Sequence, residues 1–163
     1  MEFQVGDHVV FPSQGGGVVD EVTTRDVLGE RHEYLKIRFV RGNMEMLVPL
    51  GKNTDVGLRR AIEESELEGI ELAMREADLR LPNAWPPRHR AELDLIAEAN
   101  AYRLARLVGT LTIRDREKGL ASTEREIMEQ AKALLASEIA VATSVTFEAA
   151  QERIAGVLVD LHP

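Results

Sequence analysis

The stretch Gly51-Lys-Asn-Thr-Asp-Val-Gly57 divides the 163-residue chain into two parts with different hydrophobic patterns. It is polar and has glycine at both ends, which is typical of a loop between structural elements. Before this loop apolar residues alternate with polar ones or form short runs, and after it they recur at helical spacing. We therefore predict an α+β fold, with a small antiparallel β domain at residues 1–52 and a compact all-α domain at residues 53–163.

Four segments before the loop have the composition of β-strands, because they are rich in β-branched residues and are separated by Gly, Pro or Asn. They span residues 5–12, 16–22, 33–39 and 44–48. Leu28-Gly29 and Gly42-Asn43 fall where hairpin turns are expected, and Gly15-Gly-Gly17 is expected at a sharp bend. Four or five short strands indicate a small curled sheet or barrel whose last strand lies at an edge.

The second part of the chain is expected to contain five helices. Ser65-Glu-Leu-Glu68 and Thr123-Glu-Arg-Glu126 are capping-box patterns, and Asn100 is expected to cap a helix that ends near Gly119. The other two helices are expected from Pro87 to about Ala97 and from about Thr146 onward. Their buried faces should include Leu67, Ile70, Leu72, Met74, Leu104, Leu107, Val108, Leu111, Ile127, Leu134, Leu135, Ile139, Phe147, Ile154, Val157 and Leu158.

The segment at residues 81–90 contains the only Trp of the chain and three of its six Pro. Pro86 disfavours a helical conformation at Trp85, so we expect Trp85 to lie just before a helix. A large apolar ring at this position is either a buried anchor between two domains or a wedge that enters a partner. The residues alone favour the anchor, because tryptophan is highly buried on average.

The composition argues against several classes of protein. The absence of Cys excludes disulfides and thiolate metal sites, and no apolar run has the length of a signal peptide or a membrane span, so a cytoplasmic protein is expected. The four His residues lack a metal-ligand spacing, and no nucleophile with its base is recognisable. We expect no metal, no cofactor and no small-molecule substrate, and an enzyme with a pocket between the domains is a minor alternative.

The net charge of -8 is unevenly distributed along the chain. Residues 79–118 carry eight Lys or Arg against five acidic residues, a local charge of +3. A basic segment in an acidic chain can contact phosphate locally while the rest discourages indiscriminate binding to nucleic acid. The alternative is a solvated helix face with ion pairs.

Six short motifs occur in an order that resembles the CarD/CdnL family of bacterial transcription regulators, whose N-terminal domain is shared with transcription-repair coupling factor. They are residues 3–12 (FQVGDHVVFP), Gly15 to Gly17, Val48-Pro49, Val56-Gly-Leu-Arg59, Pro82-Asn-Ala-Trp85 and Arg88-His-Arg90. The resemblance covers most of the chain. It implies a Tudor-like β domain that binds the β subunit of RNA polymerase, joined to a helical domain that contacts promoter DNA.

The resemblance also implies roles for individual residues. Trp85 matches a wedge in the DNA minor groove at the upstream edge of the melted bubble, and Arg88, Arg90 and Arg125 match basic positions that contact phosphate. Arg25 matches a polymerase contact. The remaining residues expected at the polymerase, on the edge strand, are Met44, Met46 and Leu47, where Leu47 replaces an Arg found in some members.

Three residues depart from the family pattern. Pro87 replaces a residue that is often basic, and Leu95 and Ala99 stand where the family more often has Lys and Gly. We therefore expect weaker DNA contact than in relatives. The sequence as a whole predicts a noncatalytic transcription factor that binds RNA polymerase and stabilises the open promoter complex. A protein-interaction adaptor with Trp85 buried is the alternative.

Overall fold

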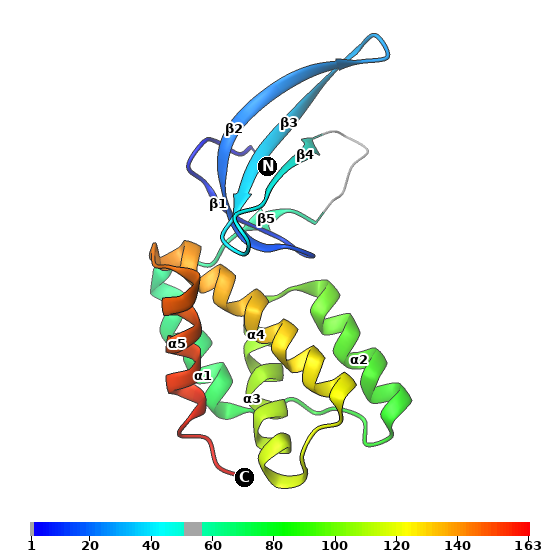
Figure 1. Cartoon of the computed structure of the whole chain (residues 1–163), viewed down its shortest axis with the longest axis vertical. Coiled ribbons are helices and arrows are strands. Elements are labelled where there is room, and N and C mark those ends of the chain that lie inside the picture. Colours follow the sequence, from blue (N-terminus) through cyan, green and yellow to red (C-terminus); the bar gives the residue numbers. More distant parts are fainter. Residues whose placement is uncertain (1, 51–56) are drawn as a thin grey trace.

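The computed structural model describes residues 2–50 and 57–163. An antiparallel sheet at the N-terminus lies at one end of a helical bundle, and the C-terminus lies at the far end of that bundle (Figure 1). The predicted α+β fold is therefore confirmed. The predicted domain boundary, between residues 52 and 53, lies outside the described residues.

The sheet has five strands in the order β4-β3-β2-β1-β5, and all neighbouring strands are antiparallel. All four predicted strands are present, and the last of them, β4, lies at an edge as predicted. β2 and β3 are longer than predicted and form a hairpin arm that points away from the helices (Figure 1). The strands are β1 (His8–Phe11), β2 (Gly15–Val27), β3 (Glu30–Phe39), β4 (Glu45–Leu50) and β5 (Arg59–Arg60).

Both predicted hairpin turns are confirmed. Leu28 and Gly29, between β2 and β3, have φ angles of 51° and 81°. Gly42 and Asn43, between β3 and β4, have φ angles of 68° and 49°. Positive φ at two successive residues matches the right-handed twist of the strands on either side.

The predicted bend at Gly15 to Gly17 is wrong. The turn lies at residues 12–14, and the three glycines begin β2 and pair with β1. Their role is close packing, because a Cβ atom on Gly16 would lie 2.4 Å from the carbonyl oxygen of Ser137 in the helix below. The amide of Gly16 donates a hydrogen bond to Ser137 Oγ at 2.9 Å. Glycine therefore lets the strand lie directly against a helix.

All five predicted helices are present. They are α1 (Leu67–Glu76), α2 (Trp85–Glu98), α3 (Ala101–Lys118), α4 (Ser122–Thr143) and α5 (Phe147–Leu158), and a short 3-10 helix, η1 (Glu64–Glu66), precedes α1. Among the described residues, no single helix has the length and apolar character needed to span a membrane, and only α4 with α5, bent by 115°, meet those criteria as a pair.

The predicted cap at Asn100 is confirmed, because its side chain accepts the backbone N–H of Arg103 at 3.1 Å. The predicted helix start near Thr146 is also confirmed, and the Thr146 side chain accepts the backbone N–H of Ala149 at 3.0 Å. The end of α3 at Gly119 is also confirmed. The caps at Ser65 and Thr123 are wrong. The capping box before α1 is formed by Glu63 and Glu66, because η1 takes up Ser65, and α4 begins at Ser122, so that Thr123 already lies in its first turn.

α2 begins at Trp85 and not at Pro87. Ala84 is the extended residue before the helix, with φ -73° and ψ 139°, and Pro86 occupies the second helical position. Proline is tolerated there because the first N–H groups of a helix have no intrahelical acceptor. Trp85 therefore lies in the first turn of α2, where the sequence had predicted an extended residue outside the helix.

The helical core is built around α3, whose predicted stripe of Leu104, Leu107, Val108 and Leu111 is fully buried. The other predicted helix faces are buried or partly buried except at Leu72, which is 56% exposed and was wrongly included. A second, smaller core lies within the sheet around Leu35, Ile37 and Phe39. The sheet and the bundle thus each bury their own apolar residues.

A partly buried ion pair joins the sheet to the bundle. Arg59 of β5 donates to both carboxylate oxygens of Glu138 in α4, each at 2.7 Å, and to the carbonyl oxygen of Ala99 at 2.6 Å. Glu138 is 1% exposed and also accepts the amide of Ile62 at 2.9 Å. Several hydrogen bonds to one buried carboxylate fix the sheet on α4.

Candidate functional site

Trp85 lies at the surface, at the N-terminal end of α2. Its side chain is 36% exposed. The indole stacks on His89, with ring centroids 4.8 Å apart at an interplanar angle of 35°, and the Arg88 guanidinium lies 5.1 Å from its centroid. The ring is thus not a buried anchor between the sheet and the bundle.

Arg88 points inward from the same turn of α2. It is 7% exposed, its Nε donates to Glu124 Oε2 at 2.8 Å, and one terminal nitrogen donates to the carbonyl oxygen of Asn83. A phosphate contact by Arg88 would require this pair to open. The family resemblance grouped Arg88 with Arg90, but the two side chains face in different directions, inward and outward.

The carboxyl groups of Glu92 and Glu124 are buried next to Arg88. Burial, with the neighbouring Glu124 carboxylate, raises the pKa of Glu92 to about 8. Burial also acts to raise the pKa of Glu124, but the hydrogen bond from Arg88, the neighbouring Glu92 carboxyl and the charges of Arg88 and Arg114 outweigh it and hold that pKa below its usual range. Glu92 is thus neutral at pH 7 and Glu124 is the anion that pairs with Arg88.

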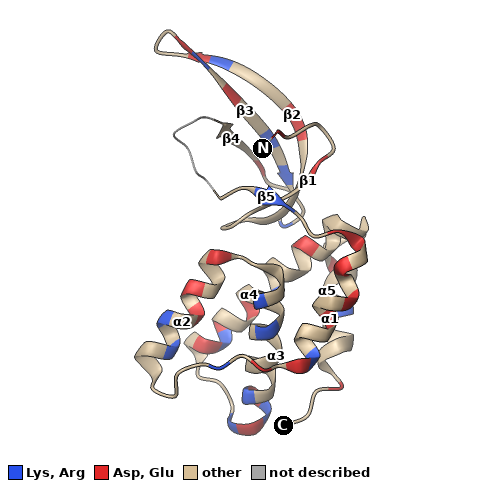
Figure 2. Cartoon of the chain, turned by 180° about the vertical axis from the view of Figure 1, so that it is seen from behind, with Lys and Arg blue, Asp and Glu red and all other residues tan. Residues whose placement is uncertain are grey.

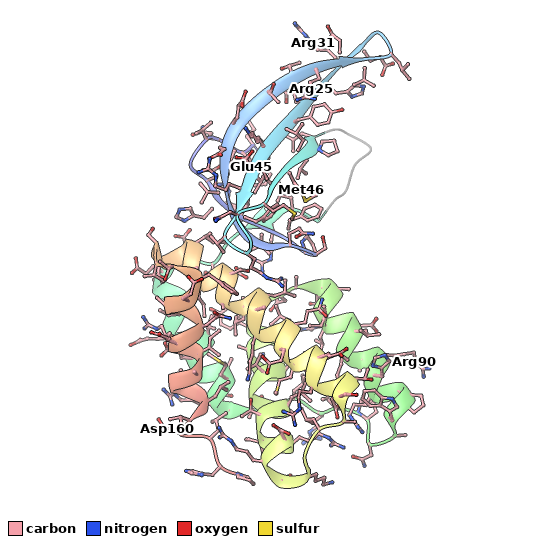
Figure 3. All side chains as sticks on the ribbon, in the orientation of Figure 1. Arg25, Arg31, Glu45, Met46, Arg90 and Asp160 are labelled. Carbon is pink, nitrogen blue, oxygen red and sulfur yellow. The ribbon has the colours of Figure 1, made fainter. Side chains whose placement is uncertain are left out.

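Arg90 is exposed on the outer face of α2 (Figure 3). In the part of the chain that the structure describes, no acidic side chain forms an ion pair with it. Arg125 is also exposed, but it pairs with both oxygens of Asp115 at 2.7 and 3.1 Å. The hydrogen bond from Arg125 is the main cause that lowers the pKa of Asp115. Of the three arginines predicted to contact DNA, Arg90 is therefore the one that is exposed and has no ion-pair partner among the described residues.

Ion pairs engage other cations of the basic segment. Arg103 pairs with Glu98 at 3.0 Å and Arg106 with Asp78 at 3.5 Å. Basic side chains lie near the start of α2, and acidic ones follow along the same helix (Figure 2). In the first turns of α2, Arg90 is thus the exposed cation, because Arg88 is buried against Glu124.

Arg25 and Leu47 share one face of the sheet. Side chains alternate between faces, and pairing places Arg25 opposite His32 and Lys36 opposite Leu47, so these residues point the same way. They border a shallow hollow of about 320 Å³, lined by Glu21, Thr23, Arg25, Lys36, Glu45, Met46 and Leu47. Figure 3 shows Arg25 on the arm and Arg90 at the opposite end of the molecule.

The two methionines predicted at the polymerase lie differently. Met46 pairs with Ile37 and packs partly against the core of the sheet, on the face away from Leu47. Met44 precedes β4 and is 38% exposed. β4 itself ends the sheet, and no strand among the described residues pairs with its outer edge. An outer edge of this kind can accept an added strand from a partner.

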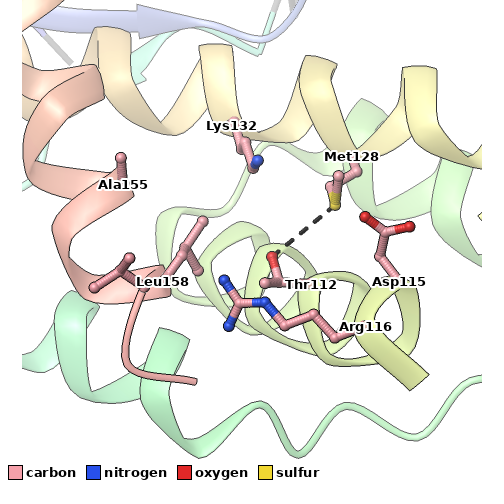
Figure 4. Close-up of a pocket in the computed structure, with 8 residues that line it drawn as sticks. Thr112, Asp115, Arg116, Met128, Lys132, Ala155 and Leu158 are labelled. Carbon is pink, nitrogen blue, oxygen red and sulfur yellow. Dashed lines mark hydrogen bonds between the residues drawn. The ribbon is translucent and has the colours of Figure 1, made fainter. Parts of the chain in front are cut away.

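A further hollow, of about 240 Å³, lies between α3, α4 and α5 (Figure 4). Its polar groups already have partners: Asp115 pairs with Arg125, Arg116 donates to the Leu161 carbonyl, and Thr112 to the Val108 carbonyl. This hollow lies within the bundle, whereas the enzyme alternative required one between the domains. Within residues 2–50 and 57–163, no group of three or more His, Asp and Glu side chains could hold a metal ion.

Sequence reasoning missed Glu92, Glu124 and His89. Glu92 lies four residues after Arg88, on the buried face of α2, and a charged pair at that spacing on an otherwise inward face was the available signal. The pairing of Arg88 with Glu124 joins α2 to α4 across 36 residues, and no sequence spacing indicates it.

Comparison with known proteins assigns both halves of the chain. The model of the CarD-like/TRCF RID domain matches residues 3–62, which include all five strands, and that of the CarD C-terminal domain matches residues 71–155. A Bacillus subtilis (strain 168) protein named "Putative transcription factor YdeB" is 28% identical over 146 residues, which is 88% of this chain and 94% of that protein. The family is one of transcription regulators and not of enzymes. The chain therefore belongs to the CarD family of transcription regulators.

Proposed function

We propose that this protein binds the β subunit of RNA polymerase through its sheet and stabilises the open promoter complex through Trp85, wedged into the minor groove at the upstream edge of the bubble. The observation that carries this proposal is the exposed indole in the first turn of α2. A tryptophan that serves only the fold is normally buried more completely.

The wedge mechanism follows from a difference in cost between two states of DNA. Inserting an apolar side chain between bases costs a few kcal/mol of unstacking, and the cost is least where the duplex is already melted. Trp85 therefore binds the open promoter better than the closed one. A ligand shifts an equilibrium only by its differential affinity for the two states, so this preference prolongs the open complex.

Binding to polymerase would raise the local concentration of Trp85 at the promoter DNA. A chain with a net charge of -8 binds free DNA poorly, and few of its cations are available for phosphate. Attachment to polymerase makes DNA contact intramolecular. Arg25 and Leu47 on one sheet face, with Met44 and Met46 beside the open edge of β4, form the surface proposed for this attachment.

The division of labour follows the two predicted domains. Residues 1–52 would bind polymerase and residues 53–163 would contact DNA, with β5 from the second segment completing the sheet of the first. Arg90 would contact phosphate directly, whereas Arg88 and Arg125 would first have to leave Glu124 and Asp115. The proposed site of action is the cytoplasm, on promoter DNA.

Trp85→Ala tests the wedge. Because the ring is partly exposed, the midpoint of thermal unfolding should stay close to that of the wild type, while the lifetime of open promoter complexes should fall about tenfold, the scale of one lost base–aromatic stack. Binding to the isolated β lobe of polymerase should be unchanged. An unaltered lifetime, or a loss of several kcal/mol in stability as for a buried Trp, would refute the wedge.

Arg25→Glu tests the polymerase surface, and Arg31→Glu is its matched control. Both residues lie on the arm, but Arg25 pairs with His32 whereas Arg31 pairs with Asp26, so the two side chains point to opposite faces. Pull-down with the β lobe should fail for Arg25→Glu and for Met46→Pro, which breaks the β4 edge, and should succeed for Arg31→Glu. Equal binding by all three variants would show that the interface lies elsewhere on the protein.

A further inference from the structure

The guanidinium of Arg88 has a different partner on each of its sides. Nε donates to Glu124 Oε2 at 2.8 Å, and one terminal nitrogen lies 3.4 Å from Glu124 Oε1. The other terminal nitrogen donates to the carbonyl oxygen of Asn83, in the loop before α2. The guanidinium carbon Cζ lies over the Trp85 ring, 5.1 Å from its centroid. One buried side chain therefore connects the loop, α4 and the indole.

The orientation of the indole depends on this connection. Trp85 belongs to neither core cluster, and its ring–ring and cation–π contacts among the described residues are with His89 and Arg88. The cation–π contact with Arg88 exists only while the guanidinium stays where Glu124 holds it. Glu124 thus acts on Trp85 through Arg88, although it does not touch the indole.

Loss of the Glu124 charge would release Arg88. Both side chains are almost fully buried, at 7% and 3% exposure, and a buried guanidinium without its anion is strongly disfavoured. Arg88 would turn toward solvent and leave the indole. Lysine at this position could not replace it, because an ammonium lacks the planar fork that serves a carboxylate and a carbonyl while stacking on a ring.

We propose that Glu124 and Arg88 are positioning residues that hold the Trp85 indole in one orientation before it meets DNA. This inference rests on the proposed wedge function. A side chain that is ordered in advance loses less conformational freedom when it inserts. The expected gain is roughly twofold to tenfold in the lifetime of the open complex, the scale for ordering one side chain.

The first experiment replaces the ion pair by apolar residues of similar size, in the double variant Arg88→Met with Glu124→Leu. Such replacements of a buried pair commonly preserve or raise stability, so packing survives while the guanidinium is removed. Since Trp85 is the only Trp, the decay of fluorescence anisotropy reports on this ring alone. We expect faster local depolarisation and a lifetime shortened twofold to tenfold. A folded double variant with unchanged anisotropy and lifetime would show that the pair serves only the fold.

The second experiment is a cycle that works even if the double variant does not fold. Glu124→Gln should shorten the open-complex lifetime in the wild-type background and have no further effect in the Trp85→Ala background, because it acts through the missing ring. Equal shortening in both backgrounds would overturn the proposal. Glu98→Gln removes the exposed partner of Arg103 at the other end of α2 and is the matched control. It should change neither the anisotropy decay of Trp85 nor the open-complex lifetime.

The two proposals fail in distinguishable ways. Anisotropy is measured on the free protein, without polymerase or DNA. If the indole loosens in Glu124→Gln but Trp85→Ala keeps its open-complex lifetime, the wedge is refuted and the positioning of the ring by Glu124 still holds. If the indole stays rigid while Trp85→Ala shortens the lifetime, the wedge stands and the positioning role is refuted.

Discussion

Leu28 occupies a backbone conformation that suits other residues better. It lies at the tip of the arm with φ 51° and is 101% exposed, so no packing compensates for the left-handed geometry. Asparagine followed by glycine is the preferred pair in such a turn. We predict that Leu28→Asn raises the free energy of unfolding by about 1 kcal/mol, measured by urea denaturation. Gly29→Ala, at φ 81°, should lower it, and equal stability of all three proteins would contradict this account.

Glu92 gives the protein a pH-dependent stability whose sign can be stated. Its pKa is raised from 4.5 to about 8 by burial and by Glu124, with the charges of Arg88 and Arg114 acting in the opposite direction. The stability that neutral Glu92 contributes is fully present below pH 4.5 and is lost as the pH rises toward 8, because the unfolded chain releases this proton first.

Glu92→Gln should remove this dependence. Glutamine is close in shape to the neutral acid and does not titrate, so the variant should match the wild type near pH 4.5 and exceed it in stability above pH 8. Urea denaturation from pH 4.5 to 9 measures the difference. Parallel pH profiles for the two proteins would mean that Glu92 is ionised in the folded state.

At the scale of residues, the sequence predicted types better than orientations. The average burial of tryptophan favoured an anchor at Trp85, and only the family resemblance favoured a wedge; the ring is in fact partly exposed. Arg88 and Arg90 are two residues apart, so on a helix they face different ways, and the buried partner of Arg88 comes from α4. Neither burial nor that partner follows from local sequence.

Gly16 sets the distance between β2 and α4. A Cβ atom there would lie 2.4 Å from a backbone oxygen of Ser137, which has no rotamer by which to move away. We predict that Gly16→Ala lowers the free energy of unfolding by about 1 to 3 kcal/mol, the usual cost of overpacking. Gly156→Ala in α5 is the control, since nothing lies within 4 Å of its Cβ and alanine favours the helix. Thermal unfolding of both variants tests this, and a Gly16→Ala protein as stable as the wild type would contradict it.

Elements were predicted well where hydrophobic periodicity is strong. The four longer strands and all five helices followed from it, and the cap at Asn100 followed from the residue type at the helix start. β5 was missed because two residues carry no period, and it exists through pairing with β1. The glycine triplet was misread as a bend, since the helix that requires it is 121 residues away in sequence.

At the scale of the whole molecule, Arg59 and Glu138 connect the sheet to the bundle. Removing Arg59 leaves the buried Glu138 without its cation, which costs roughly 3 kcal/mol, the lower end of the range for buried pairs because Arg59 is itself 32% exposed. We predict such a loss for Arg59→Ala in urea denaturation, with less than about 1 kcal/mol for the neighbouring Arg60→Ala, whose partner Asp7 belongs to a half-exposed pair. Similar losses for the two variants would show that the Arg59 pair does not fasten the two parts.

The contacts of Gly16 with Ser137 and of Arg59 with Glu138 hold the sheet on α4 and so keep the length of the molecule constant. Arg25 and Arg90 lie at opposite ends of it (Figure 3). If the Arg25 end is bound to polymerase, the Arg90 end reaches one fixed position along the DNA. Neighbouring base steps are about 3.4 Å apart, so a molecule of constant length selects one of them. The upstream limit of melting would then be set by the length of the protein and not by the base sequence at that limit.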